Sequence, residues 1–176
     1  MVRLTALTLG SLAFAALLVG SVDAQPERGS SRFESSLTSF LGDGVNQLDI
    51  SLKPNYGELT LKAGFANDPR TINVTAGGNL TVVYKGVTTH VTKQPDFKVH
   101  YTAGRFPLTF YTESSGDTSL LINTPDGKWH IDDDSGKGLN AKIKFNNPKS
   151  GRYDVYVGTF RAQLERKTKL KISELK

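Results

Sequence analysis

The chain contains no cysteine, a single tryptophan and only three histidines among its 176 residues. The absence of cysteine excludes a disulfide, a thiol nucleophile and a thiolate-bound zinc ion. The histidines, His90, His100 and His130, are too scattered to match the ligand spacing of a zinc site. Neither Gly-x-Ser-x-Gly nor His-Glu-x-x-His occurs, so the usual signatures of a serine hydrolase and of a zinc peptidase are missing.

We therefore predict that the protein is not an enzyme. The remaining catalytic alternative is a small secreted hydrolase, in which His130 pairs with Asp132 and a serine acts as the nucleophile. Closeness in sequence does not make a catalytic triad, because the nucleophile, the base and the orienting carboxylate must also meet in space.

One stretch of apolar and small residues, 4–19, follows Arg3 at the start of the chain. Val22-Asp23-Ala24 then places small side chains at the two positions that a signal peptidase reads. We predict a signal peptide over residues 1–24, with cleavage before Gln25. A membrane anchor is the alternative, but it would need about 20 predominantly apolar residues. We expect a periplasmic or extracellular protein without a transmembrane segment after cleavage.

Helical periodicity of ordinary length is missing from the rest of the sequence, which instead alternates apolar and polar residues in short segments. This pattern predicts an all-β protein, a single-domain antiparallel β-sandwich of jelly-roll-like type. We expect a flexible tether over residues 25–57 and the sandwich domain over residues 58–176. The predicted strands are 59–63, 71–75, 80–84, 97–101, 107–112, 118–122, 141–145, 153–160 and 168–173, and a further strand carries Trp129 after the turn Pro125-Asp126-Gly127.

The charge is mildly basic, with a net charge of +5 and a pI near 9.4. A basic segment can bind an anionic lipid, polysaccharide or nucleic acid through its charge alone. For a chain so mildly charged, a solvated strand face is the favoured interpretation, and we expect no specific nucleic-acid partner. Much of the charge lies near the C-terminus, in Arg161, Arg166, Lys167, Lys169, Lys171 and Lys176.

Three consecutive carboxylates, Asp132 to Asp134, lie in a loop that ends at Gly136. Adjacent like charges repel unless they are well solvated or neutralised by a cation, and calcium accepts carboxylate ligands from flexible loops. The candidate calcium ligands are Asp126, Asp132 and Asp134, with Asp117 as a weaker candidate. The loop lacks the spacing of an EF-hand, and a simply solvated acidic turn is the alternative.

This part of the sequence also resembles the bacterial pre-peptidase C-terminal (PPC) domain, a small β-sandwich of secreted peptidases and stand-alone exported proteins. The matching features are Asp117 with the strand 120–122, the turn Pro125-Asp126-Gly127, the loop 132–134, the strand 143–145, and Gly151-Arg152-Tyr153 with Val155 and Val157. Similarity to a group of small exported proteobacterial proteins extends over residues 58–160 and includes 63–65, 68–69, 76–78, 95–97, 101–104 and 153–160.

The resemblance has one departure. Members of that group often carry two cysteines, where this chain has Thr or His near 88–90 and Ile131. The disulfide that the resemblance implies is therefore absent, and the fold must rely on packing. Some members are labelled peptidases, a function that must be argued from residues rather than from fold.

Together these observations predict a non-catalytic exported module, stabilised by calcium, that binds a partner protein or supports an envelope or secretion assembly. The alternative is a polysaccharide-binding module in which Trp129 stacks on sugar rings. Aromatic residues are common in strands and usually fill cores, which argues against that alternative. The sequence specifies neither the ligand nor the oligomeric state.

Overall fold

The computed structural model describes residues 44–176, so the predicted signal peptide and residues 25–43 of the predicted tether lie outside the described residues. The described chain starts with a 3-10 helix, η1 (Gly44–Gln47), and continues as strands. Within residues 44–176, no helix is long and apolar enough to cross a membrane. The strands are β1 (Glu58–Lys62), β2 (Arg70–Ala76), β3 (Leu80–Tyr84), β4 (Val87–Val91), β5 (Phe97–Thr102), β6 (Leu108–Glu113), β7 (Ser119–Asn123), β8 (Trp129–Asp132), β9 (Lys142–Phe145), β10 (Gly151–Gly158) and β11 (Arg166–Ser173).

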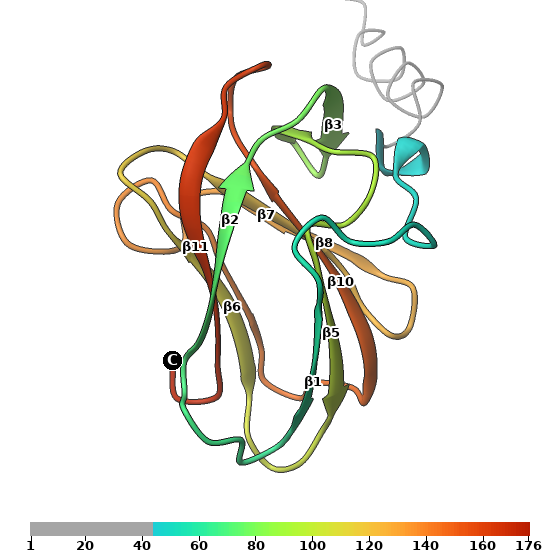
Figure 1. The fold of residues 1–176 in the computed structure, drawn as a ribbon, viewed down its shortest axis with the longest axis vertical. Coiled ribbons are helices and arrows are strands. Elements are labelled where there is room, and N and C mark those ends of the chain that lie inside the picture. The colour runs from blue at the N-terminus through green and yellow to red at the C-terminus, as the bar shows by residue number, and fades with distance from the viewer. Residues whose placement is uncertain (1–43) are drawn as a thin grey trace, which may run out of the picture.

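The strands form two main sheets that pack as a sandwich (Figure 1). One sheet has five strands in the order β1-β5-β10-β7-β8, and the other has four in the order β2-β11-β6-β9. All neighbouring strands in them are antiparallel except β1 and β5, which run parallel. Strands β3 and β4 form a separate two-stranded hairpin. These sheets confirm the predicted all-β sandwich.

The main core lies between the two sheets and follows from the alternation along the strands. Leu120 and Ile122 of β7 face Phe110 of β6 and Leu170 and Ile172 of β11, and all five side chains are buried in one cluster. Because successive side chains of a strand point to opposite faces, the intervening residues lie on the outside of the sandwich. Burial of this apolar surface is the main force that holds the sheets together.

A second, smaller core covers the outer face of the five-stranded sheet. Leu121 and Tyr156 are register partners on β7 and β10, and both are fully buried on this face. Val82 of β3, Val91 of β4 and Val45 of η1 pack onto them. Figure 1 shows η1 and the β3–β4 hairpin near the same end of the sandwich. Strand β7 is therefore buried on both faces, as its run of apolar residues requires.

The last part of the predicted tether belongs to this covering layer. The backbone amides of Asn55 and Tyr56 donate to the carbonyls of Pro95 and Asp96, at 2.9 and 2.8 Å. The buried Lys98 ammonium donates to the carbonyl of Leu52 at 2.8 Å. Residues 44–57 thus pack against the domain that was predicted over residues 58–176.

Strand β4 was not predicted from the sequence. It follows β3 after the two-residue turn Lys85-Gly86, and both turn residues have positive φ, 49° and 81°. Such a turn matches the twist of two paired strands, and glycine adopts this conformation without strain. The Lys-Gly pair between two threonine- and valine-rich segments was the available signal. At the other end of the chain, β11 confirms the predicted strand over 168–173.

Candidate functional site

Asp126 lies in the turn between β7 and β8 and is already neutralised by neighbouring groups. Its carboxylate accepts a hydrogen bond from the Thr124 hydroxyl at 2.6 Å and lies 2.9 Å from the Lys149 ammonium. The Lys128 ammonium is 3.5 Å away. The hydrogen bond from Thr124, followed by that from Lys149, holds the pKa of Asp126 well below its usual range. The structure therefore gives Asp126 two cationic partners of its own.

Asp132 lies at the opposite end of β8 from Asp126. Its carboxylate accepts hydrogen bonds from the backbone amides of Ser135, at 3.0 Å, and Lys142, at 2.8 Å. These bonds tie the acidic loop to the start of β9. Because the length of β8 lies between them, the structure does not bring Asp126 and Asp132 together as ligands of one ion.

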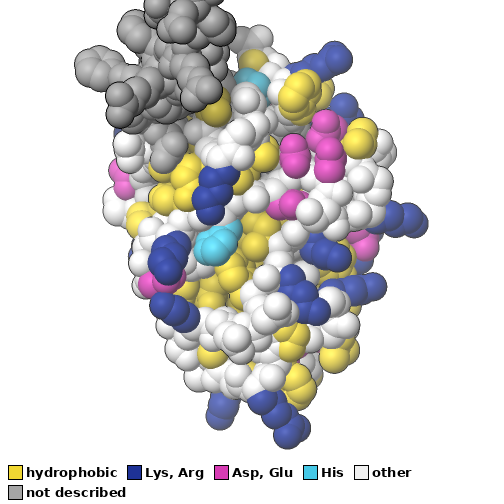
Figure 2. All heavy atoms as spheres, turned by 180° about the vertical axis from the view of Figure 1, so that it is seen from behind, with side chains coloured by type: hydrophobic (Ala, Val, Ile, Leu, Met, Phe, Trp, Pro, Cys, Tyr) yellow, Lys and Arg dark blue, Asp and Glu magenta, His cyan; other side chains and the backbone are white. Residues whose placement is uncertain are grey.

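Asp117 and Asp134 do influence each other. Burial raises the pKa of Asp117 above its ordinary value, and the carboxylates of Asp134 and Asp133 raise it further. Seen from behind, acidic side chains gather mainly in one group, whereas lysines and arginines project from many places (Figure 2). Among residues 44–176, no group of three acidic or histidine side chains is arranged to hold a metal ion. Calcium binding by this loop stays a prediction.

Trp129 is half-buried within the second core. Its ring packs against the Tyr156 ring, with centroids 5.8 Å apart, and its carbonyl accepts a hydrogen bond from the Tyr84 hydroxyl at 3.3 Å. Tyr153 and Tyr156 of β10 are buried in the main core and the second core. The aromatic rings of this side of the molecule therefore serve mainly as packing.

The three histidines have different partners. His130 packs edge-on against Phe145 at 5.0 Å, and burial lowers the pKa of its imidazole. His90 is hydrogen-bonded to the carbonyl of Thr159 at 3.2 Å, and His100 to the Glu58 carboxylate at 2.9 Å. In the described residues, the histidine paired with a carboxylate is therefore His100. It is not His130, which the hydrolase alternative would pair with Asp132.

The outer surface of the four-stranded sheet is a second candidate site. Its basic residues near the C-terminus were predicted to form a solvated strand face. Thr168, Leu170 and Ile172 of β11 point into the core, so the lysines between them point outward from the four-stranded sheet. Register then brings Lys142 of β9 and Lys171 of β11 to the two sides of Tyr111 on β6. We call this outer surface the lysine face. Its cations are Lys142, Lys144, Lys167, Lys169 and Lys171 on the strands, and Lys176 at the chain end.

The lysine face carries little negative charge. On the outward positions of its four described strands, Glu113 is the single carboxylate, and it forms an ion pair of 2.7 Å with Lys171. The hydrogen bond from Lys171 lowers the pKa of Glu113. The side chains of the face, six lysines and one glutamate, have a formal charge of +5, whereas the side chains of residues 44–176 together have +6. The outer surface of this sheet is therefore strongly basic.

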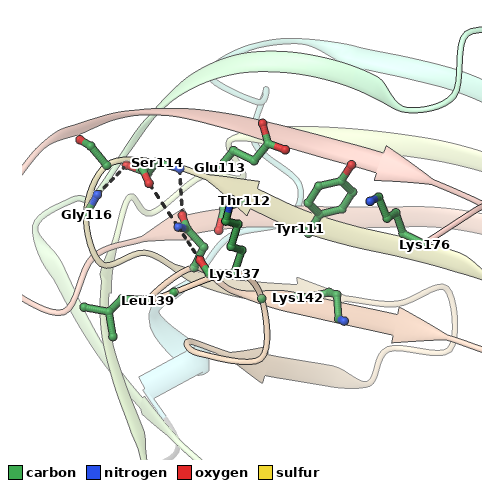
Figure 3. A pocket seen from close by; sticks show the side chains of 13 residues that line it. Tyr111, Thr112, Glu113, Ser114, Gly116, Lys137, Leu139, Lys142 and Lys176 are labelled. Carbon is green, nitrogen blue, oxygen red and sulfur yellow. Dashed lines mark hydrogen bonds between the residues drawn. The ribbon is translucent and has the colours of Figure 1, made fainter.

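A pocket of about 850 Å³ opens at one border of the lysine face. Figure 3 shows Tyr111, Lys142 and Lys176 at one end of this pocket and Lys137 and Leu139 at the other. Its wall is held by Asn140, whose side chain accepts from the Ser114 amide at 2.9 Å and donates to the Lys137 carbonyl at 3.0 Å.

A second depression of about 590 Å³ continues from the first across the face. The two share Glu113 and the neighbouring residues Ser114 and Ser115. Lys167 and Lys169 of β11 line the second depression. The two hollows together form a shallow, basic groove over strands β6 and β11.

Comparisons with known proteins give only distant likenesses. No protein-family profile matches the chain, and no curated protein matches it. Among solved structures, the pre-peptidase C-terminal domain of a collagenase from Bacillus anthracis is similar over 69% of this chain and 99% of its own, with 12% identity and a TM-score of 0.42. A periplasmic inhibitor of g-type lysozyme from Aeromonas hydrophila is similar over 66% and 96%, with 14% identity and a TM-score of 0.33.

Proposed function

We propose that this protein is an exported, non-catalytic module that binds an anionic partner on the lysine face. The observation that carries the proposal is the gathering of six lysines, with one glutamate, on the outer surface of one sheet. Of its lysines, only Lys171 forms an ion pair with a carboxylate of the face, Glu113. Within residues 44–176, the other ammonium groups of the face form no ion pair.

The arrangement of these cations favours binding over simple solvation. They come from β9, β11 and the chain end, and because β6 lies between β9 and β11, the sheet holds these two strands about 9.6 Å apart. Like charges fixed so close together repel each other, and a bound polyanion would relieve that repulsion. The field of such a face also raises the rate at which an anionic partner arrives, and salt screens it.

Binding to dextran sulfate, with neutral dextran as the reference, tests the proposal on the full chain. We expect dextran sulfate to bind at low salt, neutral dextran not to bind, and the affinity to fall steeply as salt rises. The triple variant Lys144→Glu, Lys167→Glu, Lys169→Glu should weaken dextran sulfate binding at least tenfold.

A matched control separates the face from overall charge. Lys53→Glu, Lys62→Glu, Arg161→Glu changes the net charge by the same amount at exposed positions away from the lysine face. We expect this variant to bind within threefold of the wild type. An equal loss in both triple variants would show that only net charge matters, and would overturn the proposed site.

A further inference from the structure

We infer that the pocket beside Tyr111 binds an acidic sugar unit, a pyranose that carries a carboxylate, within an anionic polysaccharide. This inference rests on the proposed function of the lysine face and names the chemical class of its ligand. It follows from three features of the pocket: one aromatic ring, cations on both sides of that ring, and a groove that leads away from it.

Tyr111 supplies an apolar surface among the charges. Its ring is half-buried at an outward position of β6, with the Lys171 ammonium 5.9 Å from the ring centroid. Burial raises the pKa of the Tyr111 hydroxyl, so the phenol stays neutral and can donate a hydrogen bond. An aromatic side chain with an apolar body and a polar tip suits a sugar ring, which has C–H faces and hydroxyl edges.

The cations around Tyr111 select an acidic sugar over a neutral one. Lys142 is the register partner of Tyr111 on β9, and Lys176 lines the same end of the pocket (Figure 3). A carboxylate on the stacked sugar would lie within reach of these ammonium groups. The volume of about 850 Å³ is in the range of about 300–1,000 Å³ that small-molecule sites occupy.

The continuing groove favours a polymer. Past Glu113, the second depression leads to Lys167 and Lys169, whose positions on β11 are separated by about 6.8 Å. A chain with one carboxylate on each sugar presents a regular row of negative charges to these cations. Glu113, already paired with Lys171, leaves a hydrogen-bond acceptor for sugar hydroxyls between the two hollows.

A single-stranded nucleic acid fits these features less well. Proteins that bind single strands without sequence preference stack successive bases on several aromatic side chains. The groove has two aromatic rings, which lie in separate hollows: Tyr111 at an outward position of β6 and Tyr56 in the second depression. The remaining outward side chains are lysine, threonine, asparagine and glutamate, which bind hydroxyl groups and charges rather than base faces.

The test compares ligands on the full chain by titration calorimetry. The ligands are polygalacturonate oligomers, the same oligomers with methyl-esterified carboxyls, dextran sulfate and a single-stranded oligothymidylate. We expect polygalacturonate to bind, methyl esterification to weaken it at least tenfold, and oligothymidylate to bind more weakly than polygalacturonate. Equal binding of the esterified oligomer, or tighter binding of oligothymidylate, would overturn the assignment to an acidic sugar.

Variants at the pocket locate the site. Tyr111→Leu keeps apolar volume but removes the ring and hydroxyl, and should weaken polygalacturonate at least tenfold while dextran sulfate stays within threefold. Lys142→Ala should weaken polygalacturonate more than Lys144→Ala, which removes a cation from the same strand outside the pocket. A circular dichroism melt of each variant verifies that it is folded.

The two proposals fail in distinguishable ways. If dextran sulfate binds through the lysine face but Tyr111→Leu leaves polygalacturonate unchanged, the acidic-sugar site is wrong and the anionic binding face stands. If wild-type protein binds neither polyanion at low salt, the proposed function itself is wrong.

Discussion

The outer faces of the two sheets differ in what lies on them. On the five-stranded sheet, Leu121 and Tyr156 point outward and are covered by the β3–β4 hairpin and by residues near Val45. On the four-stranded sheet, Lys169 and Lys171 occupy the corresponding outward positions, and in the described residues no other segment packs as a layer over them.

The difference shows how one alternating pattern produces two kinds of surface. Most inward residues of both sheets are apolar and close the same core, so the inner faces are equivalent. The outward residues determine whether a sheet face is covered or exposed. An apolar outer row must be covered by another segment of the chain, whereas a row of lysines stays in water and can bind a partner. The covered face contributes stability, and we assign recognition to the open face.

Deleting residues 44–57, which help to cover the five-stranded sheet, should lower the stability of the protein most. We expect a chain that starts at residue 58 to lose on the order of 5 kcal/mol of unfolding free energy, because Val45, Leu48 and Ile50 leave the second core. A chain that starts at residue 44 retains all of these contacts and is the matched control. Urea unfolding of both measures the difference. Equal stability of the two would show that residues 44–57 are a tether after all.

Single truncations should separate the two faces next. Leu121→Ala should cost roughly 2–5 kcal/mol, close to the cost of Leu120→Ala in the main core, because both side chains are fully buried. Lys169→Ala, on the open face, should stay within about 0.5 kcal/mol of the wild type. Chemical denaturation measures all three. A Leu121 variant as mild as the Lys169 variant would mean that the second core contributes little.

The pH should change the stability of the protein through Asp96, which lies on the side of the covered face. Its buried carboxylate accepts hydrogen bonds from the Asn55 side chain, at 2.9 Å, and from the Val157 amide, at 2.7 Å. Burial raises the pKa of Asp96 to about 7, against the lowering effect of these hydrogen bonds. The folded protein thus holds a proton that the unfolded chain releases near pH 4.

The sign of the pH effect follows from that proton. The contribution of Asp96 to stability is fully present below about pH 4 and is lost as the pH rises through about 7. Asp96→Asn cannot titrate, so the stability difference between wild type and variant should shrink or reverse as the pH rises over this window. At low pH the variant should be roughly 1–3 kcal/mol less stable than the wild type. Its side-chain NH2 group cannot accept a hydrogen bond, so it cannot replace both acceptor atoms that bind the Asn55 side chain and the Val157 amide. A pH-independent difference would contradict the raised pKa.

The sequence predicted the inner faces well, because they depend on local alternation. The alternating segment 141–145, for example, was predicted as a strand, and Ile143 of β9 is buried in the main core. The second core could not be predicted from the sequence. The apolar run Leu120 to Ile122 indicates a strand that is buried on both faces, but it does not show which distant segment covers the outer face. The cover includes Val82 and Val45, which are brought to Leu121 only by the tertiary fold.

The candidate site was predicted in part. The lysines of β11 were recognised as a basic group, but their joining with Lys142 and Tyr111 depends on the register of β6 between β9 and β11. Sequence spacing does not fix register between strands that are thirty or more residues apart. The acidic residues were recognised as well, yet Asp126 and Asp132 lie at opposite ends of a strand.

Calcium should have the smallest effect on stability, because the carboxylates of the acidic loop belong to neither core. Asp132 already accepts two backbone hydrogen bonds, which leaves the repelling pair Asp117 and Asp134 as the carboxylates with most to gain from a cation. At a calcium concentration equal to its dissociation constant, binding adds about 0.4 kcal/mol. For a domain of this size, that raises the melting temperature by roughly 1–2 °C.

A thermal melt in millimolar calcium, compared with one in chelator, measures the shift. The variant Asp117→Asn with Asp134→Asn should lose it, and Asp126→Asn, at the far end of β8, should keep it. If the wild type shows no shift, the carboxylates of the loop are simply solvated. Retention of the shift in the double variant would move the ion elsewhere. Either way, the contrast between the covered and the open face does not depend on the metal, because neither the second core nor the lysine face includes these carboxylates.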